Sequence, residues 1–187
     1  MQPLMYQFTN VTCWYASMIN GIMLLRQRCT GVACKHLVSP MEDRLLRSLT
    51  SQYTEFSETA WRGDDEYEYY LSVMECLGRI AGFKVCTCRK GKVINEVKSL
   101  NFHREVAVCN ISNGEHAILL HGKEGSRIKC FDPCWDNVNQ EESNRSYSTA
   151  PRDPRTNLIV TEKHLLSAGT DGFKMGGKHR FLTILRA

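Results

Sequence analysis

Hydrophobic residues recur at helical spacing in the first part of the chain. In residues 13–28, apolar side chains return every three or four positions, which predicts a helix. These side chains are Trp14, Met18, Ile22 and Leu25. Residues 39–53 begin with Ser-Pro-Met-Glu, a typical helix opening, and predict a second helix. A third helix is expected to begin at Asp64 or Asp65 and to end at Gly82.

Beyond Gly82, strand-like segments replace the helical pattern. Residues 83–88 alternate between apolar and polar side chains, as a strand does, and residues 93–100 predict one short helix closed by Asn101. Further β-rich runs predict strands at 105–111, 116–122, 127–133, 157–161 and 179–186, with a turn of helix at 162–169. Residues 136–157 are polar, with few apolar side chains, and predict a long surface loop.

Helices followed by antiparallel strands are typical of an α+β fold in which two layers pack against each other. The chain has 187 residues, of which 42% are hydrophobic and 24% charged, as in an ordinary globular protein. This length suits one domain over residues 1–187, with a helical part of about 1–82 and a β-rich part of about 83–187. We expect the first helix to lead a helical layer that packs on an antiparallel sheet.

Charge and hydropathy exclude several classes of partner. The formal charge of +4 is spread along the chain, and the short basic clusters at 88–92 and 176–180 are interpreted as solvated surface, so no nucleic-acid partner is expected. No apolar run reaches the ~18 residues of a membrane span. The first residues lack the basic region and cleavage site of a secretory signal. We expect a cytoplasmic protein, or one exported without a classical signal.

Nine cysteines are an unusually large and odd number for a chain of this length. They are Cys13, Cys29, Cys34, Cys76, Cys86, Cys88, Cys109, Cys130 and Cys134. An odd count without a signal peptide argues against a disulfide framework, and the spacings at 86–88 and 130–134 do not match paired zinc knuckles. Most of these cysteines lie in apolar runs, where a free thiol behaves as a small buried hydrophobe. The sequence predicts a reduced protein with no metal or cofactor and with one reactive thiol.

Four polar residues occupy positions that suit nucleophilic catalysis. Cys13 begins the first predicted helix, where the helix dipole and unpaired backbone N–H groups favour a thiolate. His116 begins a strand and can exchange protons with the sulfur and a leaving group. Asp132 ends the next strand and can fix the histidine tautomer. The side-chain amide of Gln7 can join the backbone N–H of Cys13 to bind an oxyanion.

Other residues compete for two of these roles. His121 lies five residues after His116, so in a regular strand the two side chains point to opposite faces and only one can face Cys13. His116 is preferred because it adjoins a turn, where a cleft can form. Asp136 or Asn137 could replace Asp132 as the partner of the histidine, although both follow Pro133 in the predicted loop.

Taken together, these motifs resemble those of the papain-like cysteine peptidases. The resemblance rests on Gln7, on Cys13-Trp14 at a helix start, on GEHAILLHG (114–122) and on CFDP (130–133). Among these peptidases, the motifs are most similar to those of the bacterial branch, which includes the bacteriocin-leader peptidase domains and the avirulence-type effector proteases. The resemblance implies a papain-like fold, a peptide or protein substrate, and four roles. These are Gln7 in the oxyanion hole, Cys13 as nucleophile, His116 as base and acid, and Asp132 as its orienter.

Two other classes of function remain open at this point. Transglutaminases and arylamine acetyltransferases also use Cys, His and Asp in this chain order, and they pass the acyl group to an amine instead of water. A papain-like domain can also serve as a non-catalytic binding module, although a missing triad member would then be expected. The sequence indicates neither the cleavage specificity nor the oligomeric state.

Overall fold

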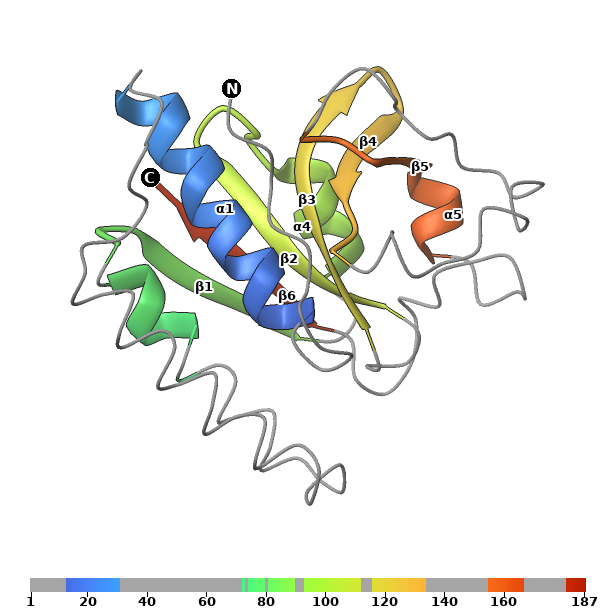
Figure 1. The fold of residues 1–187 in the computed structure, drawn as a ribbon. Coiled ribbons are helices and arrows are strands. Elements are labelled where there is room, and N and C mark those ends of the chain that lie inside the picture. Colours follow the sequence, from blue (N-terminus) through green and yellow to red (C-terminus); the bar gives the residue numbers. More distant parts are fainter. Residues whose placement is uncertain are drawn as a thin grey trace.

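A computed structural model describes residues 13–30, 72, 74–79, 81–89, 93–111, 116–133, 155–166 and 181–187. Its labelled helices and strands are α1 (Cys13–Thr30), β1 (Lys84–Arg89), α4 (Val93–Ser99), β2 (Glu105–Ile111), β3 (His116–Glu124), β4 (Arg127–Phe131), β5 (Leu158–Thr161), α5 (Glu162–Leu166) and β6 (Phe181–Arg186) (Figure 1). Each was expected from the sequence within a few residues. The helix expected at 39–53 and most of the loop expected at 136–157 lie outside the described residues.

The strands within the described residues form one antiparallel sheet of six, in the order β1-β6-β2-β3-β4-β5. β6 therefore lies between β1 and β2, and it pairs with both in antiparallel register. β3 pairs with β2 on one side and with β4 on the other. With an N-terminal helix packed on this sheet, the chain has the mixed α+β architecture that the order of elements predicted.

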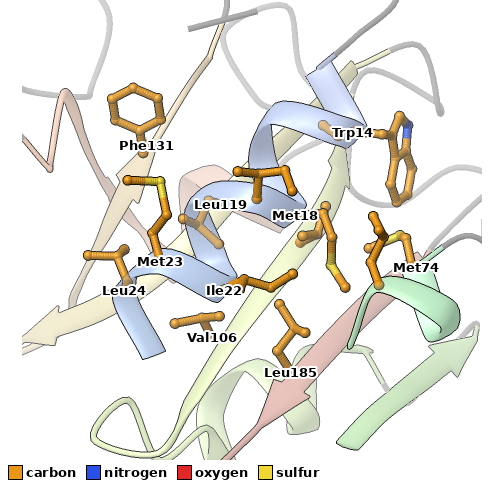
Figure 2. Packing of buried hydrophobic residues seen from close by; sticks show 14 of the residues in the cluster. Trp14, Met18, Ile22, Met23, Leu24, Met74, Val106, Leu119, Phe131 and Leu185 are labelled. Carbon is orange, nitrogen blue, oxygen red and sulfur yellow. The ribbon is translucent and has the colours of Figure 1, made fainter. Parts of the chain in front are cut away.

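The N-terminal helix α1 packs across β2, β3 and β6 (Figure 1). The apolar side chains that predicted the helix are all buried, and they join side chains of the sheet in one cluster (Figure 2). The sheet contributes Val106, Leu119 and Leu185 to this cluster. Between Cys13 and Leu25, Tyr15 is the one residue that is not buried. α1 is therefore a central helix, buried on nearly all sides between Cys13 and Leu25.

The sheet also buries its opposite face, which the two-layer expectation did not include. A second apolar cluster contains side chains of α4 and α5, among them Val97 and Leu165. Both faces of β3 carry apolar side chains. Leu119 belongs to the α1 cluster, while Ile118 and Leu120 belong to the second one. A strand that is apolar on both faces must be covered on both.

The helical segment before β1 ends near Gly82, as the sequence predicted. Residues 74–79 are helical, and the N–H of Ala81 still donates to the carbonyl of Leu77 at 2.9 Å. Gly82 then adopts a positive φ of 81°, a conformation that glycine allows at little cost. The turn directs the chain into β1, and Leu77 packs in the same cluster as α1.

Gly21 allows α1 to lie close to the sheet. A Cβ atom there would lie 2.9 Å from Cδ1 of Leu185 and 3.0 Å from Cγ2 of Val106. We expect Gly21→Ala to lower the free energy of unfolding by about 1–3 kcal/mol through overpacking, a loss reduced by the better helix propensity of alanine, worth about 1 kcal/mol. Urea unfolding measures the change. Gly21→Val should cost more, and an alanine variant more stable than the wild type contradicts the close approach.

Of the helices that the structure describes, none has the length and apolar character needed to cross a membrane.

Candidate active site

Cys13 is the first residue of α1, and its side chain is 3% exposed. The first N–H groups of a helix have no partner within the helix, and the helix dipole adds positive potential at the same end. Both effects favour negative charge on the sulfur. Cys13 lies close enough to His116, about a hundred residues away in the sequence, to raise the pKa of its ring.

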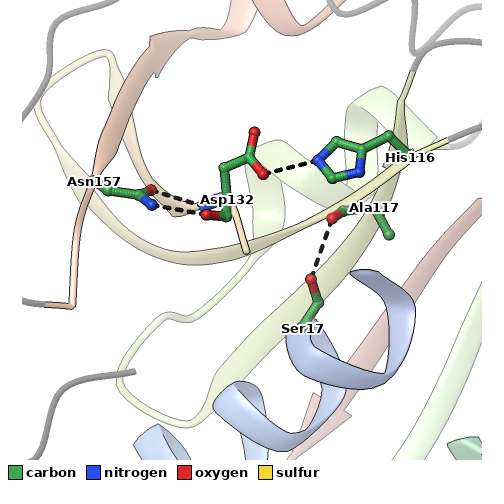
Figure 3. Close-up of polar contacts among 5 residues, drawn as sticks. All are labelled: Ser17, His116, Ala117, Asp132 and Asn157. Atoms are coloured by element: carbon green, nitrogen blue, oxygen red, sulfur yellow. Dashed lines mark hydrogen bonds and ion pairs between the residues drawn. The ribbon is translucent and has the colours of Figure 1, made fainter. Parts of the chain in front are cut away.

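A hydrogen bond between α1 and β3 fixes the distance between these two elements close to the Cys13–His116 pair. Ser17 Oγ donates to the carbonyl oxygen of Ala117 at 3.3 Å, and the contact is buried (Figure 3). Ser17 is one helical turn beyond Cys13, and Ala117 directly follows His116. The bond therefore joins α1 to β3 one helical turn away from Cys13. Sequence analysis did not identify this role for Ser17.

His116 and Asp132 form a hydrogen-bonded ion pair. Nε2 of His116 lies 2.8 Å from Oδ1 of Asp132, and the two side chains are 21% and 8% exposed (Figure 3). His116 is the first residue of β3, and Asp132 directly follows β4. Since the two strands are antiparallel neighbours, the start of one lies beside the end of the other. With Nε2 facing Asp132, the other ring nitrogen is left for Cys13.

The surroundings of His116 keep its ring protonated. Burial acts to lower the pKa of His116, but the hydrogen bonds and negative charges of Asp132 and Cys13 together outweigh it and raise the pKa from 6.5 to about 10. The ring is then an imidazolium at neutral pH. An imidazolium next to a cysteine sulfur favours the thiolate, the nucleophilic form of the thiol.

Asn157 holds the backbone of Asp132. The N–H of Asp132 donates to Asn157 Oδ1 at 2.8 Å, and Asn157 Nδ2 donates to the carbonyl of Asp132 at 2.7 Å (Figure 3). Sequence analysis placed Asn157 at the start of a strand but gave it no functional role. Its position before β5 was visible in the sequence. The pairing of β5 with β4, which brings it to Asp132, was not.

The residues that could have replaced His116 or Asp132 either contact another part of the protein or lie outside the described residues. The His121 side chain is buried, with Nε2 3.1 Å from the hydroxyl of Thr156. A register shift between Leu120 and Gly122 interrupts the regular alternation that was assumed for the two histidines. Gln7 lies outside the described residues, as do Asp136 and Asn137.

Cys29, Cys76, Cys86, Cys109 and Cys130 are also free thiols. Cys109 and Cys130 are fully buried, and burial raises the pKa of each thiol, with the charges of Cys109 and Asp132 adding to the effect on Cys130. Each donates to a backbone carbonyl oxygen at 3.7 Å. Buried thiols of this kind are inert core residues. In the described ranges, no group of three or more His, Cys, Asp or Glu side chains is placed to hold a metal ion.

Comparison of the chain with protein-family models, with curated proteins and with solved structures found no significant match. The geometry of Cys13, His116 and Asp132 is therefore the observation that bears on function.

Proposed function

We propose that the protein is a papain-like cysteine peptidase that cleaves peptide bonds through a thioester intermediate. The observation that supports this proposal best is the chain of contacts at the start of α1. Cys13 is near enough to His116 to raise the pKa of its ring, and Nε2 of His116 lies 2.8 Å from Oδ1 of Asp132. A thiol, an imidazole and a carboxylate in this order are the groups that nucleophilic acyl transfer requires.

In the first half of the reaction, the Cys13 thiolate attacks the carbonyl carbon of a peptide bond. The negative charge moves to the carbonyl oxygen, where the backbone N–H of Cys13 and the side chain of Gln7 are proposed to stabilise it. His116 then gives its proton to the nitrogen of the departing amine. The C–N bond breaks, and the acyl group remains on the sulfur as a thioester.

In the second half, His116 is neutral and accepts a proton from an incoming water molecule. The resulting hydroxide adds to the thioester carbonyl, the C–S bond breaks, and the carboxylic acid leaves. The sulfur and the imidazolium return to their starting state. Asp132 keeps one ring nitrogen engaged through both halves, so that the other nitrogen faces the sulfur and the leaving group.

Labelling under reducing conditions tests the identity of the nucleophile. We expect iodoacetamide or an epoxide inhibitor to modify Cys13 about 10-fold or more faster than the buried Cys109, because the thiolate is the reactive form. Peptide mapping by mass spectrometry locates the label, and hydrolysis of a mixed peptide library is measured in parallel. Modification of a different cysteine with simultaneous loss of hydrolysis contradicts the assignment.

The fate of the acyl group is tested in the same assay with a labelled amine. A peptidase releases free carboxylic acid and incorporates little of the amine, because water reaches the thioester. Incorporation of the amine without net hydrolysis assigns the site to acyl transfer instead. A folded protein that neither hydrolyses peptides nor incorporates the amine contradicts both activities and favours a binding module.

A further inference from the structure

The side chain of Asn157 binds Asp132 in the way that a neighbouring strand would. Its amide oxygen accepts from the Asp132 N–H, and its amide nitrogen donates to the Asp132 carbonyl, at 2.8 and 2.7 Å. Both hydrogen-bonding groups of one peptide residue are therefore engaged by one side chain. Only a primary amide of suitable length offers an acceptor and a donor side by side for this purpose.

Asp132 needs this support because it lies beyond the regular sheet. The last pair of the β4–β5 ladder is Cys130 with Leu158, and β4 ends at Phe131. The Asn157 amide thus continues the β4–β5 hydrogen bonding past the last strand pair. It reaches Asp132, whose carboxylate contacts His116 (Figure 3).

Asn157 is itself held in place on both sides. The preceding residue, Thr156, is buried and its hydroxyl lies 3.1 Å from Nε2 of His121 in β3. The following residue, Leu158, is fully buried and pairs with Cys130 in β4. Because both neighbours of Asn157 are held by contacts with the sheet, the side-chain amide of Asn157 can fix the position of Asp132.

We propose that Asn157 is a positioning residue of this site, which keeps the Asp132 carboxylate against His116 by fixing both backbone groups of Asp132. Only two side-chain torsions separate the Asp132 backbone from the carboxylate that contacts the ring, so a fixed backbone leaves the carboxylate little freedom. The catalytic consequence rests on the proposed peptidase function. The positional consequence does not depend on it.

The test is the titration of His116 in the full chain. Ring-proton NMR of labelled histidine gives the pKa of His116 in the wild type, in Asn157→Leu and in Asn157→Ala. Leucine keeps nearly the shape of asparagine without its hydrogen bonds or any new charge, and alanine removes the same amide by truncation. We expect the pKa of His116 to fall by about 1 to 2 in both variants, because a less well-placed carboxylate supports the imidazolium less.

Asn101→Ala is the matched control. The Asn101 side chain also accepts a backbone N–H, that of His103 at 3.2 Å, in the exposed turn between α4 and β2. Its removal should leave the titration of His116 unchanged. A folded Asn157 variant in which His116 titrates as in the wild type contradicts the proposal. Loss of folding in both Asn157 variants also contradicts it, because Asn157 then serves global stability and not this site.

Enzyme kinetics separate this inference from the proposed function. If the wild type hydrolyses peptides, the alkaline limb of kcat/KM should move to lower pH in the Asn157 variants by the same amount as the pKa of His116. If the wild type hydrolyses nothing but the pKa of His116 falls in both variants, the positioning role holds and the peptidase assignment is the one that fails. If the wild type is active but the titration of His116 is unchanged in both variants, the positioning role fails and the peptidase assignment holds.

Discussion

Replacement of Cys13 by serine is expected to lower kcat/KM for peptide hydrolysis by on the order of 10⁴-fold or more. The hydroxyl of serine is far less acidic than a thiol, so the contact with His116 cannot hold it as the anion at neutral pH. The helix start and the histidine contact that favour a thiolate would then act on a group that stays neutral. Hydrolysis of a substrate from the peptide library, followed by mass spectrometry, measures the loss.

Cys109→Ala is the control for this substitution. Both cysteines are buried, but Cys109 lies in β2 and bonds to a backbone carbonyl, whereas Cys13 contacts His116. The control should lose some stability from the cavity it creates and keep its kcat/KM within a few-fold. Thermal unfolding of all three proteins shows whether each is folded at the assay temperature. A folded Cys13→Ser variant with wild-type activity would place the nucleophile elsewhere.

Replacement of Asp132 by asparagine is expected to lower the pKa of His116 from about 10 by about 1 to 3. The substitution removes the negative charge and the carboxylate hydrogen bond, so burial of the ring, which lowers the pKa, is opposed only by Cys13. The catalytic rate should fall on the order of 10²- to 10⁴-fold. Histidine NMR titration measures the first effect, and kinetics over the same pH range measure the second.

The raised pKa of His116 in the folded protein makes the free energy of unfolding depend on pH. The pKa of His116 is 6.5 in the unfolded chain and about 10 in the folded protein, so folding favours the bound proton. This contribution is complete below pH 6.5 and is lost as the pH rises toward 10. In Asp132→Asn it is smaller and is lost at lower pH. Urea unfolding at pH 6 and pH 10 should therefore show a stability difference between the two proteins that shrinks as the pH rises. A constant difference contradicts the role assigned to Asp132.

The elements and the three contacting residues were predictable because their signals are local. The spacing of apolar residues marked α1, and alternation or β-rich composition marked the strands. Cys13 stands at a helix start and His116 at a strand start, positions that can be read from neighbouring residues. Asp132 was predicted from its place at the end of the strand after His116, and antiparallel pairing of consecutive strands brings those two ends together.

The features that escaped prediction depend on contacts between distant parts of the chain. The place of β6 between β1 and β2 follows from pairing between segments far apart in the sequence, which no local pattern encodes. Side chains on both faces of β3 are apolar and need cover, but only two layers were expected, because no local pattern shows which helices will cover the second face. Ser17 and Asn157 are ordinary polar residues in their own segments, and each gains a role only from the strand opposite.

The position of β6 has a consequence for the order in which the molecule assembles. Until residues 181–186 have been synthesised, β1 has no partner at its inner edge and β2 lacks one of its two neighbours. Leu185, against which α1 packs, is also missing at that stage. The helix that carries Cys13 is synthesised before these strands but can pack on the complete sheet only after β6 has been made. The packing that places Cys13 beside His116 is therefore completed only when folding of this region is nearly finished.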